Sequence, residues 1–323
     1  MASPNAVFTE LVTTTFRKHR KEFNDNLSKN NALLRRLYTR GQVRREDGGL
    51  TITCPLDYAA NGTYQRYSGY DVLNVGASDV LSAAEFAWRQ IAVNVVASGQ
   101  ELRTNKGGSR IINLVKARMK NAMRTYKNNF SADLYSDGTL PNQINGIQAL
   151  VSDTGLGTVG GIDSSLWPFW QNVVQSAAAP LQGGAAITPS ATTIESLMLP
   201  LWLALVRGDD QPDLIVMDNT YFTFFETSQT SIKRYTDETR ANAGFTSMKY
   251  KGADVIFDGG SGIPDAHGYF LNTDNVELVV HEDADMDVMD EMKPYNQDAA
   301  VIPILWMGNM VIGNRSLQGV MKA

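Results

Sequence analysis

The residues best spaced for metal chemistry form an acidic run, His281–Asp287, near the C-terminus. Carboxylate oxygens are the ligands that calcium prefers, but an EF-hand loop also needs glycine at its sixth position and glutamate at its twelfth. Counted from Asp283, those positions hold Val288 and Pro294. The run therefore favours an acidic surface at a strand end. The alternative, a metal-dependent enzyme, would use Asp283, Asp285 and Asp287.

A glycine-rich stretch, Gly155–Gly160, matches the dinucleotide-binding pattern GxGxxG. That pattern binds phosphate when its helix begins inside the motif and an acid about 20 residues later holds the ribose. Here the expected helix cap is Asp163, beyond the motif, and the next acid is Glu195. We interpret the stretch as a flexible linker at a lobe boundary.

Other reactive residues are also poorly placed for catalysis. The three histidines lie far apart in the sequence, and HExxH, GxSxG and Walker A patterns are missing from it. Cys54 has no adjacent basic residue to lower its pKa. The sequence therefore predicts no catalytic residue, no cofactor site and no metal site, and we expect the protein not to be an enzyme.

The most informative element is a predicted two-stranded ribbon, an extended β-hairpin. Apolar residues alternate along Leu50–Tyr58 and so share one face of a strand. Asn61-Gly62 predicts a tight hairpin turn, with Thr63–Val72 as the return strand. A lone ribbon is marginal in water, so it must dock on its own domain or on another subunit. The side chains predicted to make the inter-subunit contact are Leu50, Ile52, Leu56, Tyr58, Tyr64, Tyr67 and Tyr70.

The net charge of −5 conceals a segregation of charge along the chain. Residues 16–45 carry ten Lys or Arg against two acids, whereas residues 274–291 carry eight acids and no Lys or Arg. The basic segment could face nucleic acid, the acidic stretch of a neighbouring copy, or only solvent. The arginines expected to contact DNA or a neighbour are Arg35, Arg36, Arg40, Arg44 and Arg45.

Composition indicates a globular protein. The 323 residues are 43% hydrophobic and 20% charged, enough for two or more lobes. The single cysteine excludes an intrachain disulfide and suits a reducing compartment. The longest apolar run, Leu197–Val206, is too short to span a membrane, and an apolar signal segment is missing from the N-terminal sequence. We expect a soluble protein made in the cytoplasm.

The clearest helix is predicted over Arg110–Tyr135, with Ser109 as its N-cap and an apolar stripe at i, i+3, i+4 spacing. A long strand with a bulge at Arg89-Gln90 is predicted over Ser82–Val96. Residues 1–45 read as a mostly helical arm. Further helices are expected over 163–176 and 192–207, and strands over 213–217, 248–257, 276–280, 301–306 and 310–313.

An ordered set of short segments carries a resemblance to a known family. These segments are Ser28–Leu34, Asn61–Tyr64, Arg66–Tyr70, Asp133–Thr139, Gly160–Asp163, Trp167, Phe169-Trp170, Val206–Gly208, Pro212–Val216, Gly252–Val255, Tyr269–Asp274, Asn296–Ala299 and Ser316–Val320. Together they resemble the major capsid proteins of tailed bacteriophages, which have the Hong Kong 97 capsid fold. The specificity lies in the order of the set.

The resemblance implies an α+β fold with an N-terminal arm, an extended β-hairpin loop, a peripheral domain with a long spine helix, and an axial domain. On this chain they would be residues 1–45, 46–80, 81–140 and 141–267, with 268–323 returning to the peripheral sheet. The implied function is self-assembly into the icosahedral head shell of a phage virion around double-stranded DNA. An encapsulin-like compartment that holds enzyme cargo is the alternative with the same fold.

The implied partners are many copies of the chain, as hexamers and pentamers, with a portal, packaged DNA, a possible cementing or decoration protein, and no membrane. Assembly would take place in the host bacterial cytoplasm. Because the sequence begins almost directly with the arm, we expect a separate scaffolding protein and no large proteolytic maturation. Residues 48–73 contain no lysine, so Lys–Asn cross-links known in the family are not expected there.

Overall fold

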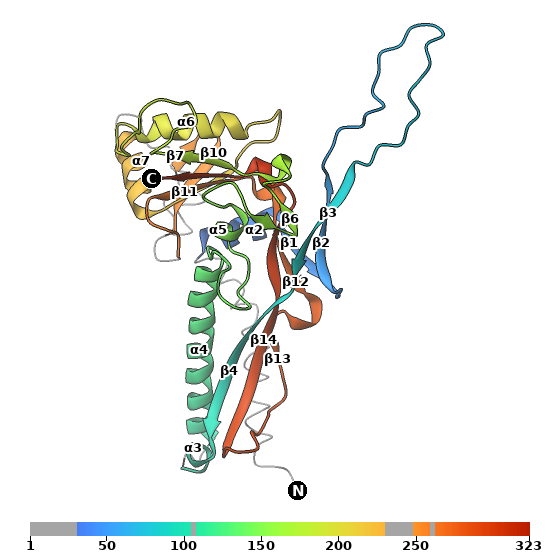
Figure 1. Cartoon of the computed structure of the whole chain (residues 1–323). Helices are drawn as coiled ribbons and strands as arrows, with labels where there is room; N and C mark the ends of the chain where they lie inside the picture. The colour runs from blue at the N-terminus through green and yellow to red at the C-terminus, as the bar shows by residue number, and fades with distance from the viewer. Residues whose placement is uncertain (1–30, 105–107, 230–247, 259–261) are drawn as a thin grey trace.

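The computed structural model describes residues 31–104, 108–229, 248–258 and 262–323. They form two lobes, each built on its own sheet, and a ribbon whose loop projects away from both (Figure 1). The elongated first lobe contains the longest helix and the longest strand. The second lobe contains the C-terminus. The first 30 residues of the expected arm lie outside the described residues.

The first lobe packs the spine helix α4 (Gly108–Asp133) against a five-stranded sheet. The sheet runs β1 (Val43–Glu46), β12 (Val276–His281), β14 (Ala299–Ile312), β13 (Asp287–Val288), with β4 (Arg89–Ser98) paired along β14.

The predicted apolar stripe of α4 faces the sheet. Met119, Ala122, Tyr126 and Phe130 are buried at i, i+3, i+4 spacing, and the Phe130 ring meets Trp306 of β14 at 5.1 Å between centroids. The predicted helix is therefore confirmed. It begins and ends two residues earlier than expected, so Ser109 lies inside the helix and is not its cap.

The predicted long strand is divided at Trp88 into β3 (Leu81–Ala87) and β4. β3 pairs with β2 (Thr51–Asp57) in the ribbon, whereas β4 pairs with β14 in the first lobe. Buried Asn309 supports the break, since its amide donates to the Ala87 carbonyl at 2.8 Å. The bulge expected at Arg89-Gln90 is wrong, because both residues pair in regular register with Gly308 and Met307 of β14. The break lies at Trp88, where the chain passes from one sheet to another.

The predicted return strand, Thr63–Val72, is wrong. Residues 58–80, all of them described, contain no strand, and neither Asn61 nor Gly62 has the positive φ of a tight hairpin turn. The Asn61 side chain instead accepts hydrogen bonds from the Thr63 N–H at 2.9 Å and from the Ser78 hydroxyl at 3.3 Å. The chain therefore continues as a long loop before returning as β3.

The second lobe has a six-stranded sheet. Its order is β7 (Val173–Ser176), β15 (Gly319–Lys322), β11 (His267–Leu271), β8 (Leu214–Met217), β10 (Ala253–Phe257), β9 (Met248–Tyr250). Helices α6 (Ile194–Leu205) and α7 (Asn219–Ser228) bury their apolar side chains with this sheet in one core. Asp218 caps α7 by accepting from the Thr220 and Tyr221 N–H groups.

The remaining elements are short. They are α2 (Ala32–Arg40), α3 (Gly99–Thr104), α5 (Ile147–Leu150), β5 (Thr158–Val159) and β6 (Ile162–Asp163), with single 3₁₀ turns η1 (Pro168–Trp170), η3 (Thr273–Asn275), η4 (Glu282–Ala284) and η5 (Arg315–Leu317).

Three expectations about the second half of the chain are corrected. The helix over 163–176 is wrong, because that segment holds the end of β6, then η1 and β7. The two strands over 301–306 and 310–313 are one strand, β14. β11 and β15, placed with the returning peripheral strands, pair with β8 or with each other and so belong to the second lobe. Fully apolar strands bury both faces and carry no sign of which sheet they join.

Candidate assembly surfaces

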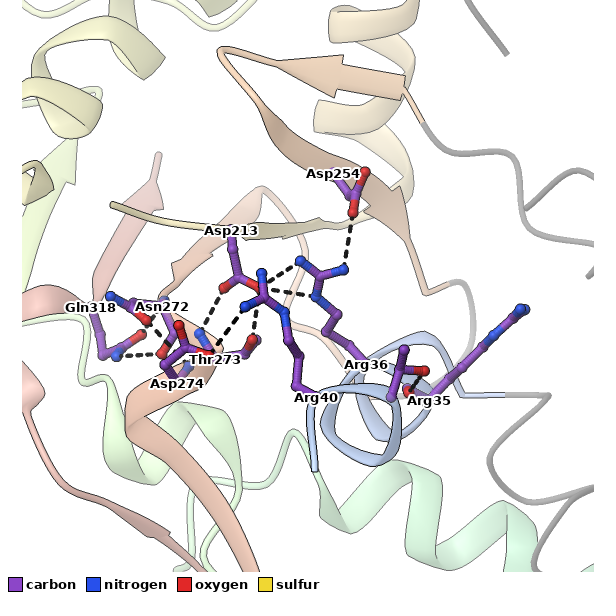
Figure 2. Close-up of polar contacts among 10 residues, drawn as sticks. Arg35, Arg36, Arg40, Asp213, Asp254, Asn272, Thr273, Asp274 and Gln318 are labelled. Carbon is purple, nitrogen blue, oxygen red and sulfur yellow. Dashed lines mark hydrogen bonds and ion pairs between the residues drawn. The ribbon is translucent and has the colours of Figure 1, made fainter. Parts of the chain in front are cut away.

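The basic helix α2 is oriented by its caps and its apolar face. Asn31 accepts from the Leu34 N–H at 2.9 Å, and Gly41 ends the helix with φ of 73°. Leu33, Leu34 and Leu37 are fully buried in the core that contains the first-lobe sheet. This packing leaves Arg36 and Arg40, one turn apart, facing the start of β8 (Figure 2).

Arg36 and Arg40 form an ion-pair network with aspartates from distant segments. The Arg36 Nε and Nη2 atoms donate to Asp213 Oδ2 at 2.9 and 2.7 Å, and its Nη1 lies 3.4 Å from Asp254 (Figure 2). Arg40 lies 3.4 Å from Asp213 and 3.3 Å from Asp274. Asp213 also accepts from the Thr273 N–H and hydroxyl, each at 2.7 Å. The network joins α2 to the starts of β8 and β10 in the second lobe and to η3, just before β12, in the first.

Two further arginines pair within the chain. Arg44 lies 3.1 Å from Glu46 and 3.4 Å from Glu277, and Arg45 lies 2.7 Å from Asp285. These contacts arise because β1 runs parallel to β12 and so brings the basic segment alongside the acidic stretch.

The basic segment was expected to contact DNA or a neighbouring copy. Arg36, Arg40, Arg44 and Arg45 each pair with acids of their own chain, and their contact to DNA or a neighbour stays a prediction. Figure 2 shows Arg35 pointing away from the network, and its contact to DNA or a neighbour stays a prediction.

Six of the seven predicted ribbon contacts divide into a buried and an exposed group, and Tyr58 is intermediate between them. Ile52 and Leu56 are buried in the core of their own chain, so the prediction that they contact another subunit is wrong. The ribbon therefore has a docking surface in its own protein. Leu50, Tyr64, Tyr67 and Tyr70 are exposed, by 65% or more of each residue.

The glycine-rich stretch 155–160 holds the base of the ribbon. The Glu85 N–H donates to the Gly160 carbonyl at 2.9 Å. Gly160 has φ of 58°, and a Cβ there would lie 2.7 Å from the Ala84 Cβ. Only glycine allows the approach of these two backbones. The interpretation of this stretch as a flexible linker is corrected by these contacts.

Arg315, which sequence reasoning missed, is fully buried beneath the same stretch. Its guanidinium donates to the Leu150 carbonyl at 2.8 Å, to the Ser152 hydroxyl at 2.8 Å and to the Ser164 hydroxyl at 3.1 Å. Burial lowers its pKa to about 10, so it remains charged at neutral pH. The only sequence signal was a lone arginine near an otherwise apolar C-terminus.

Tyr58 lies half-buried at the ribbon base in an aromatic cluster. Its ring centroid is 5.8 Å from that of Trp167 and 6.1 Å from that of Phe169. The cluster lines a groove of about 510 Å³ between the ribbon base and the loop that precedes β7. Asp163 also lines this groove, and hydrogen bonds from Ser165 lower its pKa. This groove, too, was not foreseen from the sequence.

The described residues contain no group of three or more His, Cys, Asp or Glu side chains arranged to hold a metal ion. In the acidic run, Asp285 is paired with Arg45. Cys54 is buried, and burial raises its pKa to about 11, which suppresses the thiolate. Among the described helices, none is long and apolar enough to cross a membrane.

Similarity to known proteins is structural. No family model matches the sequence, and no curated protein matches it. The cyanophage A-1(L) capsid structure aligns at a TM-score of 0.59 and 15% identity over 87% of this chain and 90% of that one. A structure of Mycobacterium phage Bobi aligns at a TM-score of 0.54 and 8% identity over 88% of this chain and 89% of that one. The capsid of an empty GTA particle aligns at a TM-score of 0.51 and 12% identity over 88% of each chain.

These alignments each cover nearly the whole of both proteins. The chain therefore has the Hong Kong 97 capsid fold of tailed bacteriophages.

Proposed function

We propose that this protein is a non-enzymatic shell protein whose copies assemble into an icosahedral phage head around double-stranded DNA. The observation that carries the proposal is the loop over residues 58–80. It extends away from both lobes (Figure 1). Its residues Tyr64, Tyr67 and Tyr70 are exposed to solvent. Exposed apolar surface of this kind is typical of a protein interaction site.

The internal ion pairs support the same function. Because Arg36, Arg40, Arg44 and Arg45 pair with acids of the same chain, little of that positive charge is left to neutralise DNA. We infer that contacts between copies hold the shell together, and that packaged DNA is held with little sequence preference. A scaffolding protein, a portal and a decoration protein are the further partners we propose, with assembly in a bacterial cytoplasm.

The test removes the loop and keeps the ribbon base. The Tyr58 N–H donates to the Val80 carbonyl at 3.0 Å, so these residues already close a hairpin. Replacing 59–79 with Asn-Gly supplies a two-residue turn between them. We expect a folded, monomeric protein that forms no closed shells in negative-stain electron microscopy, with or without a candidate scaffolding protein.

A matched control replaces exposed Leu140, outside the loop, with serine, and should assemble normally. Closed shells from the loop-replaced protein would contradict the proposed role of the loop. A wild-type chain that stays monomeric under all these conditions would contradict the shell function itself. Particles that enclose a co-purifying enzyme in place of DNA would favour the encapsulin-like compartment.

A further inference from the structure

The spine helix α4 carries a row of basic side chains along one flank. Lys116, Lys120, Arg124 and Lys127 follow one another at intervals of four, four and three residues. At about 3.6 residues per turn, all four lie within roughly a quarter of the helix circumference, beside the buried stripe and not on it. The first three are exposed and Lys127 is partly exposed. Figure 1 shows α4 along one side of the first lobe, so the row borders the outside of the molecule.

The charge of this row is not neutralised by the described part of the chain. None of its four side chains forms an ion pair with another residue that the structure describes. The neighbouring Arg118 differs, since its guanidinium donates to Glu101 and to the Val96 carbonyl. Within α4 the only acid is Asp133, at the last position of the helix. The row therefore has a positive charge that the paired arginines of α2 and β1 lack.

The surroundings of the row favour a polyanion over a protein surface as its partner. Beside it lie small or polar residues that are all exposed, namely Ala117, Asn121, Thr125 and Asn128. Among the described side chains of α4, no large apolar one is exposed. Protein interfaces are built on aromatic and apolar anchors and are depleted in lysine. Phosphate oxygens, in contrast, accept hydrogen bonds from lysine, arginine, asparagine and threonine. The row therefore fits a phosphodiester backbone.

The length of the row matches several phosphates of a double helix. Lys127 lies 11 residues after Lys116, which is a rise of about 16 Å along the axis of α4. One strand of B-DNA carries a phosphate about every 3.4 Å along the duplex axis. About five phosphates therefore span the row, and its four cations are enough to neutralise three or four of them.

We propose that the basic row of α4 belongs to the inner surface of the shell and contacts the phosphate backbone of the packaged DNA. This inference rests on the proposed shell function, and it names the face of the chain that points inward. Contacts to phosphates carry no sequence information, so the row binds any duplex. One chain makes only a few such contacts and binds DNA weakly. The many copies in a shell add their contacts through multivalency.

Salt dependence tests the contact, with the full-length chain and a fluorescent duplex of arbitrary sequence. The logarithm of the binding constant falls with the logarithm of the salt concentration, with a slope of about −0.9 for each phosphate neutralised. We expect the variant Lys116→Gln/Lys120→Gln/Arg124→Gln to make that slope shallower by about 2.7. Glutamine is a good helix former, so the circular dichroism of the variant should stay unchanged.

A matched control removes the same charge elsewhere. The variant Lys249→Gln/Lys251→Gln/Lys293→Gln changes three exposed lysines outside α4 and should keep the wild-type slope. Equal slopes for the row variant and the wild type would overturn the proposal, as would equal losses in the row variant and the control. A wild-type chain that does not bind the duplex at low salt would overturn it too.

A thiol on the row tests its inward orientation in assembled shells. The variant Lys120→Cys/Cys54→Ala is treated with a small maleimide and with a maleimide coupled to a globular protein too large to cross the shell. We expect the small reagent to label free chains and closed shells alike, and the large one to label closed shells several-fold less than free chains. Efficient labelling of shells by the large reagent would place the row outside. Protection of shells from both reagents would place it between copies.

Either of these two labelling results would overturn the DNA contact and leave the shell function standing, because closed shells are present in both. Failure of the proposed function has a different signature, since the wild-type chain would then form no closed shells to label.

Discussion

The guanidinium of Arg36 places two hydrogen bonds on one carboxylate oxygen of Asp213, at 2.9 and 2.7 Å, across 177 residues of sequence. Arg36 belongs to α2, whose leucines lie in the core of the first lobe, whereas Asp213 immediately precedes β8 of the second-lobe sheet. The pair therefore connects the two lobes. Arg36 and Arg40, two of the arginines that suggested a nucleic-acid surface, thus form ion pairs within the chain.

Removing Arg36 should destabilise the monomer. Its side chain and that of Asp213 are only 15% and 14% exposed, so Arg36→Met leaves a largely desolvated carboxylate with Arg40 at 3.4 Å as its nearest cation. We expect the free energy of unfolding in urea to fall by about 2 to 3 kcal/mol. Arg124→Met, on the exposed face of α4, is the matched control and should change it by less than about 0.5 kcal/mol.

The double variant Arg36→Met/Asp213→Asn sharpens this prediction. Since the two side chains contact each other, the loss in the double variant should be smaller than the sum of the two single losses. Additive losses would show that Arg36 stabilises the protein through its aliphatic packing and not through Asp213.

Gly160 should be essential to the docking of the ribbon. Gly160→Ala strains a backbone with φ of 58° and also pushes a methyl group against Ala84. Gly208→Ala is a control for the strain alone, because Gly208 has φ of 63° and its added Cβ would meet nothing within 4 Å. We expect Gly160→Ala to lower the free energy of unfolding by about 1 to 3 kcal/mol more than Gly208→Ala does.

Hydrogen exchange locates that effect. The Glu85 amide, which donates to the Gly160 carbonyl, should lose protection in Gly160→Ala and keep it in Gly208→Ala. Equal protection in the two variants would mean that the ribbon docks without this close approach.

Local patterns predicted the elements but not their partners. The stripe of α4 is a property of a short window and is confirmed, whereas the long strand over Ser82–Val96 is divided at Trp88 between two sheets. The destination of β15 was mistaken because a buried strand reads the same in either sheet. The return strand was mistaken because the Asn61 side chain closes a local turn that competes with a hairpin.

The candidate surfaces were harder to predict for the same reason. The sequence singled out the tyrosines at positions 64, 67 and 70, and the structure leaves them exposed, while their contact with another copy stays a prediction. The sequence reveals the charge of Arg36 but not its partner, because Asp213 lies 177 residues away along the chain. Trp167 entered the sequence analysis only as part of the resemblance, and its position beside Tyr58 is what reveals a groove.

Arg315 should be needed to position the loop between α5 and β7. Arg315→Met leaves the Leu150 carbonyl and the Ser152 and Ser164 hydroxyls without its hydrogen bonds in a buried site. We expect a loss of about 3 kcal/mol or more in unfolding free energy, and faster proteolysis within 151–170. Arg315→Lys keeps the charge but not the planar fork, so it should recover only part of the loss. Full recovery by lysine would show that charge alone matters.

Cys54 gives a prediction about pH. Burial raises the pKa of its thiol from about 9 to about 11, so the unfolded chain ionises at lower pH than the folded one. The contribution of the Cys54 thiol to the free energy of unfolding is fully present below pH 9. It is lost as pH rises from 9 to 11, by up to about 2 to 3 kcal/mol. Wild type should therefore lose unfolding free energy in urea more steeply over this range than Cys54→Ala.

The comparison with Cys54→Ala isolates the thiol. Burial also raises the pKa of Tyr221 and of Tyr250 to about 12, but both proteins contain these tyrosines and their effects cancel in the difference. A thiol reagent at pH 8 gives an independent measurement, because native Cys54 should react at least roughly a hundredfold more slowly than the urea-unfolded chain. Parallel pH profiles together with fast native labelling would mean that the ribbon base opens readily, so that Ile52 and Leu56 become available to a partner after all.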